Sequence, residues 1–158
     1  MFKIFISTTI FFFSSNLYSN DNLKHSQLFC PDYEFEIDKS SVRVYAFEFL
    51  EDENLNLIFG FYKPENKNII RQHKGIYSSN IKTLFINIIL TIGDTTFSDE
   101  TTYYINRQTL ELTVNYTSTN IIRQCEIVKV EDLYAFTNSY FNDESEKLLK
   151  EMLSKNKI

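Results

Sequence analysis

The side chains that most readily carry out chemistry are scarce in this chain. It has two cysteines, Cys30 and Cys125, and two histidines, His25 and His73. Metal sites draw on cysteine and histidine at short spacings, and no C-x-x-C or H-x-x-H pair occurs. With three glycines and no G-x-S-x-G, the sequence also offers no phosphate-cradling loop or nucleophile elbow. We therefore predict no catalytic residue, no cofactor and no metal.

Carboxylates are the remaining route to catalysis. A hydrolase of this type needs one acid with a raised pKa beside a second that stays ionised. Glu48 is the best single candidate, because it lies between Phe47 and Phe49 on a run that is apolar on both faces. An acid at a sheet edge, or one paired with Arg43 or Arg107, is the favoured interpretation, since charged residues are rarely buried alone. An envelope hydrolase using acidic residues is kept as the alternative function.

The first residues of the chain predict export. Met1–Ser19 has one positive charge at Lys3, an apolar stretch from Ile4 to Phe13 and then small polar residues, the order of a cleavable signal peptide. The apolar stretch is too short to cross a bilayer as a helix, so we expect no transmembrane anchor after cleavage. Localisation is predicted to be periplasmic or secreted.

The predicted export bears on whether the two cysteines form a disulfide. In an oxidising compartment, a chain with two cysteines is expected to join them, so we predict a disulfide between Cys30 and Cys125. Such a bridge closes a loop of most of the mature chain, which is worth about 4 to 5 kcal/mol in the chain-entropy model. Two separate thiols or an intermolecular bridge are the alternatives.

Alternating apolar and polar residues predict strands through most of the chain. We expect an all-β domain over 30–137, a single antiparallel barrel or sandwich of about seven to eight strands. The nearly continuous apolar run Leu84–Ile92 and the end-to-end disulfide favour the barrel. The predicted strands are Tyr33–Ile37, Val42–Leu50, Leu55–Phe61, Ile69–Tyr77, Leu84–Ile92, Thr101–Ile105, Leu110–Tyr116 and Ile121–Val130.

Two segments flank this domain. Residues 20–29 are polar and without period, and are predicted to be a loose leader. Residues 142–157 are predicted to form a C-terminal helix packed on the sheet, with Asn142 or Asp143 as its cap. Its expected apolar stripe is Leu148, Leu149, Met152 and Leu153.

The chain is rich in aromatic residues, with fifteen Phe and ten Tyr. Most have the parity of core residues. Tyr62 and Tyr104 have the opposite parity, and with Arg107 they form a possible binding surface. The residues from Tyr134 to Phe141 could extend that surface, although packing beneath the terminal helix is the preferred interpretation.

The segment Ile105-Asn106-Arg107-Gln108-Thr109-Leu110-Glu111-Leu112, with Cys125 further on, carries a resemblance. It resembles the I-[DN]-R-x-T-G-x-L hairpin and downstream cysteine of small uncharacterised exported bacterial proteins. Leu110 departs from that pattern, in which glycine is usual. The resemblance implies a cysteine paired to one near the mature N-terminus, and it implies no activity.

The net charge of −5 limits the partners. A phosphate backbone requires a basic face, so no nucleic acid is expected. The leading hypothesis is an exported, non-catalytic binding or interaction module of the cell envelope. Its ligand would be a protein or a small apolar molecule.

Overall fold

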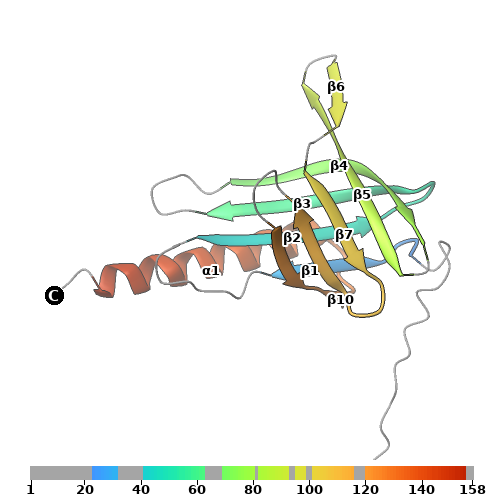
Figure 1. The fold of residues 1–158 in the computed structure, drawn as a ribbon. Helices are drawn as coiled ribbons and strands as arrows, with labels where there is room; N and C mark the ends of the chain where they lie inside the picture. The colour runs from blue at the N-terminus through green and yellow to red at the C-terminus, as the bar shows by residue number, and fades with distance from the viewer. Residues whose placement is uncertain are drawn as a thin grey trace, which may run out of the picture.

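The structure is a computed structural model that describes residues 23–31, 41–62, 69–80, 82–92, 95–98, 101–115 and 120–155 (Figure 1). The predicted signal peptide and the predicted strand Tyr33–Ile37 lie outside these residues. The described elements are β1(Gln27–Pro31), β2(Val42–Phe49), β3(Asn54–Tyr62), β4(Ile69–Ser79), β5(Thr83–Ile92), β6(Thr95–Ser98), β7(Thr102–Asn106), β8(Glu111–Asn115), β9(Asn120–Gln124), β10(Glu126–Val128) and α1(Leu133–Lys155).

The strands form one antiparallel sheet that curls into a nearly closed barrel. Its order is β10-β1-β2-β3-β4-β5-β7-β8-β9, with β6 paired to β5 beside this path. β6 and β7 both pair with β5, each along a different part of that strand. β9 and β10 are separated by Cys125 alone. The described part of the chain contributes ten strands, nine of them along this path. The predicted antiparallel β fold with a C-terminal helix is confirmed.

The barrel wall separates two apolar cores. Tyr45, Phe47 and Phe49 of β2 point into the barrel, where they pack with inward residues of the other strands. Val44 and Ala46 of the same strand point outward into a second core beneath α1. Both faces of β2 are therefore buried, which explains why its sequence alternates less cleanly than that of a half-solvated strand.

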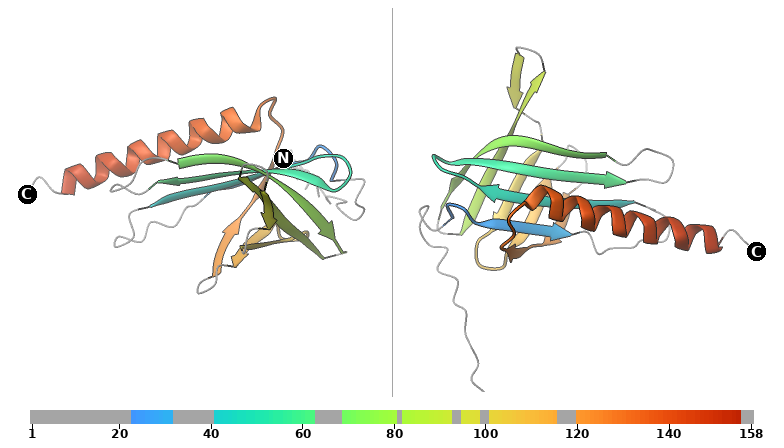
Figure 2. Two further views of the ribbon diagram at one scale, coloured as in Figure 1. Left: turned by 90° about the horizontal axis from the view of Figure 1, so that it is seen from above. Right: turned by 180° about the vertical axis from the view of Figure 1, so that it is seen from behind.

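The helix covers the outer face of β2 and β3, while β5, β7 and β8 lie on the far side of the barrel (Figure 2). It comes very close to the sheet at Gly60, where a Cβ would lie 2.9 Å from Cδ2 of Phe141. Thr137 and Ser145 also lie on this buried face, and their hydroxyls donate to the carbonyls of Leu133 and Phe141. Each small polar side chain is thereby satisfied inside an apolar interface.

The helix differs from its predicted bounds. It begins at Leu133, so the residues from Tyr134 to Phe141 form its first half and do not lie beneath it. The cap is Asp132, whose Oδ1 accepts a hydrogen bond from the Ala135 amide at 2.9 Å. The stripe that packs on the sheet runs through Leu133, Phe141 and Leu148, whereas Leu149 and Leu153 are exposed.

The predicted leader also contains ordered structure. Leu23 is buried in the barrel core, and β1 begins at Gln27, so residues 20–29 are not wholly a loose segment. Leu28 faces the barrel interior and Phe29 faces the helix. This strand was not apparent from the sequence, because its alternation of inward and outward residues covers only a few positions and its neighbours in the chain are polar.

Candidate functional site

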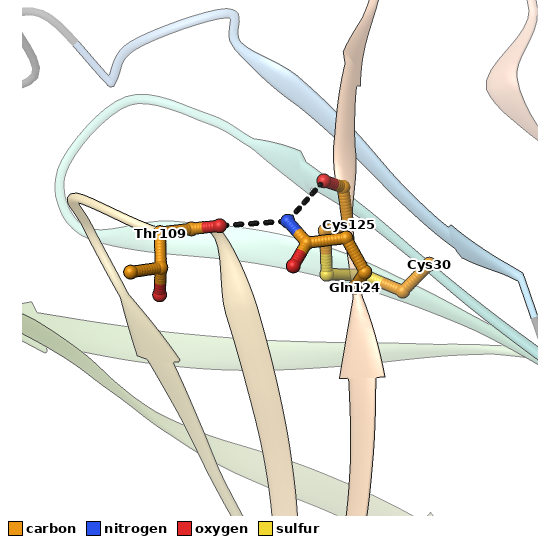
Figure 3. Close-up of a disulfide and its surroundings, with 4 residues drawn as sticks. All are labelled: Cys30, Thr109, Gln124 and Cys125. Carbon is orange, nitrogen blue, oxygen red and sulfur yellow. Dashed lines mark hydrogen bonds between the residues drawn. A yellow bond between two sulfur atoms is a disulfide. The ribbon is translucent and has the colours of Figure 1, made fainter.

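The disulfide lies where the barrel closes. Cys30 of β1 and Cys125 are joined, with their Cα atoms 4.1 Å apart, as predicted (Figure 3). Upstream of Cys125 the chain pairs with β8, and downstream it pairs with β1. The bridge therefore holds the chain at the point where it changes partners and closes the sheet.

Hydrogen bonds reinforce this closure on both sides of the bridge. The Gln124 side-chain amide donates to the carbonyls of Thr109, at 2.6 Å, and Cys125, at 3.2 Å (Figure 3). Gln27 clamps Val130 by donating to its carbonyl at 3.1 Å and accepting from its amide at 3.0 Å. The disulfide and these hydrogen bonds together form a structural cross-link that holds the barrel closed.

Arg107 occupies the turn between β7 and β8. The Asn106 side chain organises this turn by accepting from the amides of Gln108 and Thr109. Arg107 is buried, with 5% of its surface exposed, and its Nη1 donates to the Asn80 carbonyl at 2.9 Å. It joins this turn to the neighbouring turn between β4 and β5, so it does not present a free guanidinium to a ligand.

The structure separates the other two residues of the predicted binding surface. Tyr62, 8% exposed, lies on the outer face of β3 in the core beneath α1. Tyr104 lies on the outer face of β7, on the side of the barrel away from the helix, and its ring meets that of Phe85 edge-on at 5.5 Å. Tyr62, Tyr104 and Arg107 therefore do not form one surface.

Tyr104 instead belongs to a row that crosses the uncovered half of the barrel. Cross-strand pairing places its members side by side, from Ser78 to Phe85, Tyr104, Thr113 and Ile122. Each row member alternates with an inward residue such as Tyr77, so the row points outward. We call this row, together with Ile76 next to it on β4, the open face.

The open face exposes large apolar side chains. Ile122 is 55% exposed, Ile76 is 45% exposed and Phe85 is 37% exposed. Sequence reasoning missed these three residues. In each strand they have the opposite parity to the core residues, so the sequence could have indicated that they point outward. Which of them lie side by side depends on the register of strand pairing.

The barrel interior is packed with side chains. Inward aromatic rings contact one another, as in the pairs Tyr45–Phe59 at 5.2 Å and Phe49–Tyr77 at 5.1 Å. A barrel of this size either fills its interior with side chains or holds one small ligand. The described residues follow the first pattern.

Two acidic side chains lie on β2 and in the turn that follows it. Glu48 points outward from β2 and accepts a hydrogen bond from Asn56 Nδ2 at 2.9 Å. Glu51 lies in an exposed turn, where the hydrogen bond and charge of Lys24, 2.7 Å away, lower the pKa of its carboxyl. The same oxygen is 4.0 Å from Nε2 of His25. Within the described residues, no three His, Cys, Asp or Glu side chains gather as a metal site would require.

Among the described residues, no helix has the length and apolar character needed to cross a membrane. The chain matches no protein-family model, no curated protein and no solved structure.

Proposed function

We propose that this protein is an exported, non-catalytic interaction module of the cell envelope that binds a protein partner through its open face. The row across β5, β7, β8 and β9 carries the proposal, with Phe85 and Ile122 exposed and Tyr104 and Thr113 half-buried between them. Contiguous exposed apolar surface on a soluble domain marks an interaction site more often than scattered residues do. Aromatic residues are also enriched in protein interfaces.

Two observations support this choice over a small ligand inside the barrel. The described inward side chains form one apolar cluster, in which aromatic rings contact one another. The outer wall beneath α1 is apolar and covered, whereas the open face is apolar and uncovered by any described element. A partner on the open face would bury side chains that water now contacts.

Export rests on the signal-peptide order of residues 1–19 and on the disulfide. Disulfides persist in the periplasm and outside the cell and are rare in the cytosol. A bridge that closes the barrel would be kept oxidised in such a compartment. A periplasmic or secreted location is therefore part of the proposal.

Affinity capture from envelope extract tests the proposal with three proteins. Wild type and Ile127→Lys should recover the same partner, whereas Phe85→Lys should lose it because a charge is placed on the open face. Ile127 is a matched control, since it is exposed on β10 and does not belong to that face. Equal capture by all three proteins, or an apolar molecule retained by wild type in native mass spectrometry, would contradict the proposal.

A further inference from the structure

The strand β4 changes its neighbours along its length. Lys74, Gly75 and Ile76 pair with β3 on one side and with β5 on the other. Residues 69–72 pair with β3, and no described strand pairs with them on the other side. Beyond Ile89, β5 turns away from β4 and continues as an arm with β6 (Figure 1). The first part of β4 is therefore an edge of the described sheet.

The hydrogen bonds of the ladder show which backbone groups point to this edge. In an antiparallel pair, hydrogen-bonded positions alternate along each strand. The Tyr77 amide donates to the Glu53 carbonyl at 2.9 Å, so the odd-numbered residues of β4 direct their N–H and C=O groups to β3. The Asn80 amide donates to the Thr83 carbonyl at 2.9 Å, so the even-numbered residues direct theirs to the opposite side.

Two even-numbered residues, Ile70 and Gln72, lie in the part of β4 that β5 does not cover. Their amides and carbonyls form a template for one more strand, which is how extended peptides add to an exposed sheet edge. Ile70 packs against the core beneath α1, so an apolar side chain beside it would extend that core. Arg71 points to the opposite face of the strand and is exposed.

The charged side chains along this edge are basic. Arg71 and Lys74 are exposed, and no described carboxylate forms an ion pair with either. The strands β3, β4 and β5 contain no Asp or Glu, although the whole chain has a net charge of −5. The carboxylate on the row of Lys74 is Glu48, two strands away, where Asn56 donates to it. Basic side chains at an edge oppose pairing with a second copy of that edge and attract an acidic strand.

We infer that the edge of β4 binds an extended acidic segment of another protein, which adds to the sheet as a strand beside Ile70 and Gln72. Its acidic side chains would lie opposite Arg71 and its apolar side chains beside Ile70, because side chains alternate along a strand. Alternating acidic and apolar residues are therefore the pattern of this partner. The inference goes beyond the proposed function, since residues 69–72 are not members of the open face.

A short peptide should bind this edge weakly. Each of the two residues offers one N–H and one C=O, and each hydrogen bond replaces one that water already made. We expect a dissociation constant on the order of 1 mM for a peptide that has no other contact. Nuclear magnetic resonance measures binding in this range and reports it at single amides.

The probe is a capped eight-residue peptide of alternating Glu and Val, added to the folded, disulfide-bonded protein. The amide protons of Ile70 and Gln72 should shift downfield until the edge is saturated, because they gain hydrogen bonds. A peptide with Lys in place of Glu, and one whose backbone amides are N-methylated, should each bind at least about tenfold more weakly. Equal binding of the N-methylated peptide would overturn strand addition, because charge alone would then be recognised.

Substitutions on β4 test the two parts of the recognition separately. Gln72→Pro removes an N–H at the edge and leaves the hydrogen bonds to β3, so it should weaken binding at least about tenfold. Gln72→Thr is the matched control, since it keeps this N–H, and it should bind as wild type does. Arg71→Glu changes only a side chain, so it keeps the test valid if the proline variant unfolds. It should reverse the preference in favour of the Lys peptide.

Phe85→Lys separates this site from the open face, and it should bind the peptide as wild type does. Peptide-induced shifts centred on Phe85, or no saturable shift at about 10 mM peptide, would overturn the inference. Shifts of Ile70 and Gln72 that depend on protein concentration without peptide would make a second copy the occupant and would also overturn it. Peptide binding by a protein that captures no envelope partner would leave the inference standing while the proposed function fell.

Discussion

At the scale of single residues, the turn between β7 and β8 contains a strained position. Leu110 has φ of 56°, in the left-handed region that glycine occupies without a steric penalty. The hairpin pattern that this segment resembles has glycine at the same place. Leu110 also packs against the barrel core, so its side chain stabilises the fold while its backbone is unfavourable.

Comparing two truncations separates these contributions. Leu110→Ala and Leu110→Gly both lose the core contacts, but only glycine relieves the left-handed strain. We expect Leu110→Gly to be the more stable of the two by about 1 kcal/mol, the reverse of the usual order in regular structure. Urea unfolding of both variants checks the order, and a more stable Leu110→Ala would contradict it.

Tyr77 is predicted to make the protein sensitive to alkaline pH. Burial, with the Glu53 carboxylate as a smaller contribution, raises the pKa of its phenol in the folded chain. Above the ordinary pKa of about 10, the unfolded chain loses this proton first, so stability falls as the pH rises toward the folded value. Tyr77→Phe keeps the ring beside Phe49 and should show a shallower loss in urea unfolding between about pH 9 and about pH 11. An equal loss in both proteins would contradict the prediction.

Glu48 tests the alternative of an acid-dependent hydrolase. Glu48→Gln retains an oxygen that can accept the hydrogen bond from Asn56 Nδ2. We expect it to change the free energy of unfolding by about 1 kcal/mol or less. Wild type and variant should be indistinguishable in assays with glycan and ester substrates. A hydrolysis present in wild type and absent from a folded Glu48→Gln would favour the enzyme instead.

At the scale of elements, the contact between α1 and the sheet depends on a missing side chain. At Gly60 a Cβ would lie 2.7 Å from Cγ1 of Val44 and 2.9 Å from Cδ2 of Phe141. Both distances are shorter than ordinary carbon contacts, so the helix can approach this closely only over glycine. The helix also contacts Phe29 of β1 through two aromatic rings. Those of Phe136 and Tyr140 meet the Phe29 ring edge-on, with centroids 5.1 and 4.9 Å away.

Gly60→Ala should therefore destabilise the fold by about 1 to 3 kcal/mol through overpacking. The Val44→Ala substitution removes the nearest clashing atom, so the double variant should be more stable than the sum of the two single effects predicts. A double-mutant cycle in urea measures this coupling. Strict additivity would show that the helix shifts away instead of clashing.

At the scale of the whole molecule, the disulfide joins β1 to the junction of β9 and β10, where the sheet closes. It spans a sequence separation of 95 residues and lies next to the Gln27 clamp on Val130. The last strand position has only the short β10 to pair with β1. Closure of the barrel thus depends on a few backbone hydrogen bonds and one covalent bond.

Replacing both cysteines should show how much closure contributes. The Cys30→Ala and Cys125→Ala double variant should lose up to about 4 kcal/mol of unfolding free energy, less if the unfolded chain keeps some structure. Urea unfolding measures this loss, and thiol counting on wild type unfolded without reductant should find no free thiol. Equal stability of the two proteins would contradict a role of the bridge in closure.

The sequence by itself determined the fold class, most strand positions and the cysteine pairing. Period-two alternation depends only on neighbouring residues, as in Leu55, Leu57 and Phe59, and the pairing followed from the predicted compartment and from the count of two cysteines. The predicted start of α1 was wrong because Asn142 and Asp143 are also plausible caps in the sequence. The first half of the helix, from its cap at Asp132, is held by packing on the sheet, as at Phe141 over Gly60.

Only the tertiary structure decided which outward residues are covered by the helix and which contact one another. Tyr62 and Tyr104 share the same parity, but α1 covers the first and leaves the second beside Phe85. Arg107 looks like an exposed turn residue, but it is buried because the turn at Asn80 folds against it. The open face arises from the register of strands distant in sequence, and periodicity within one strand carries no information about that register.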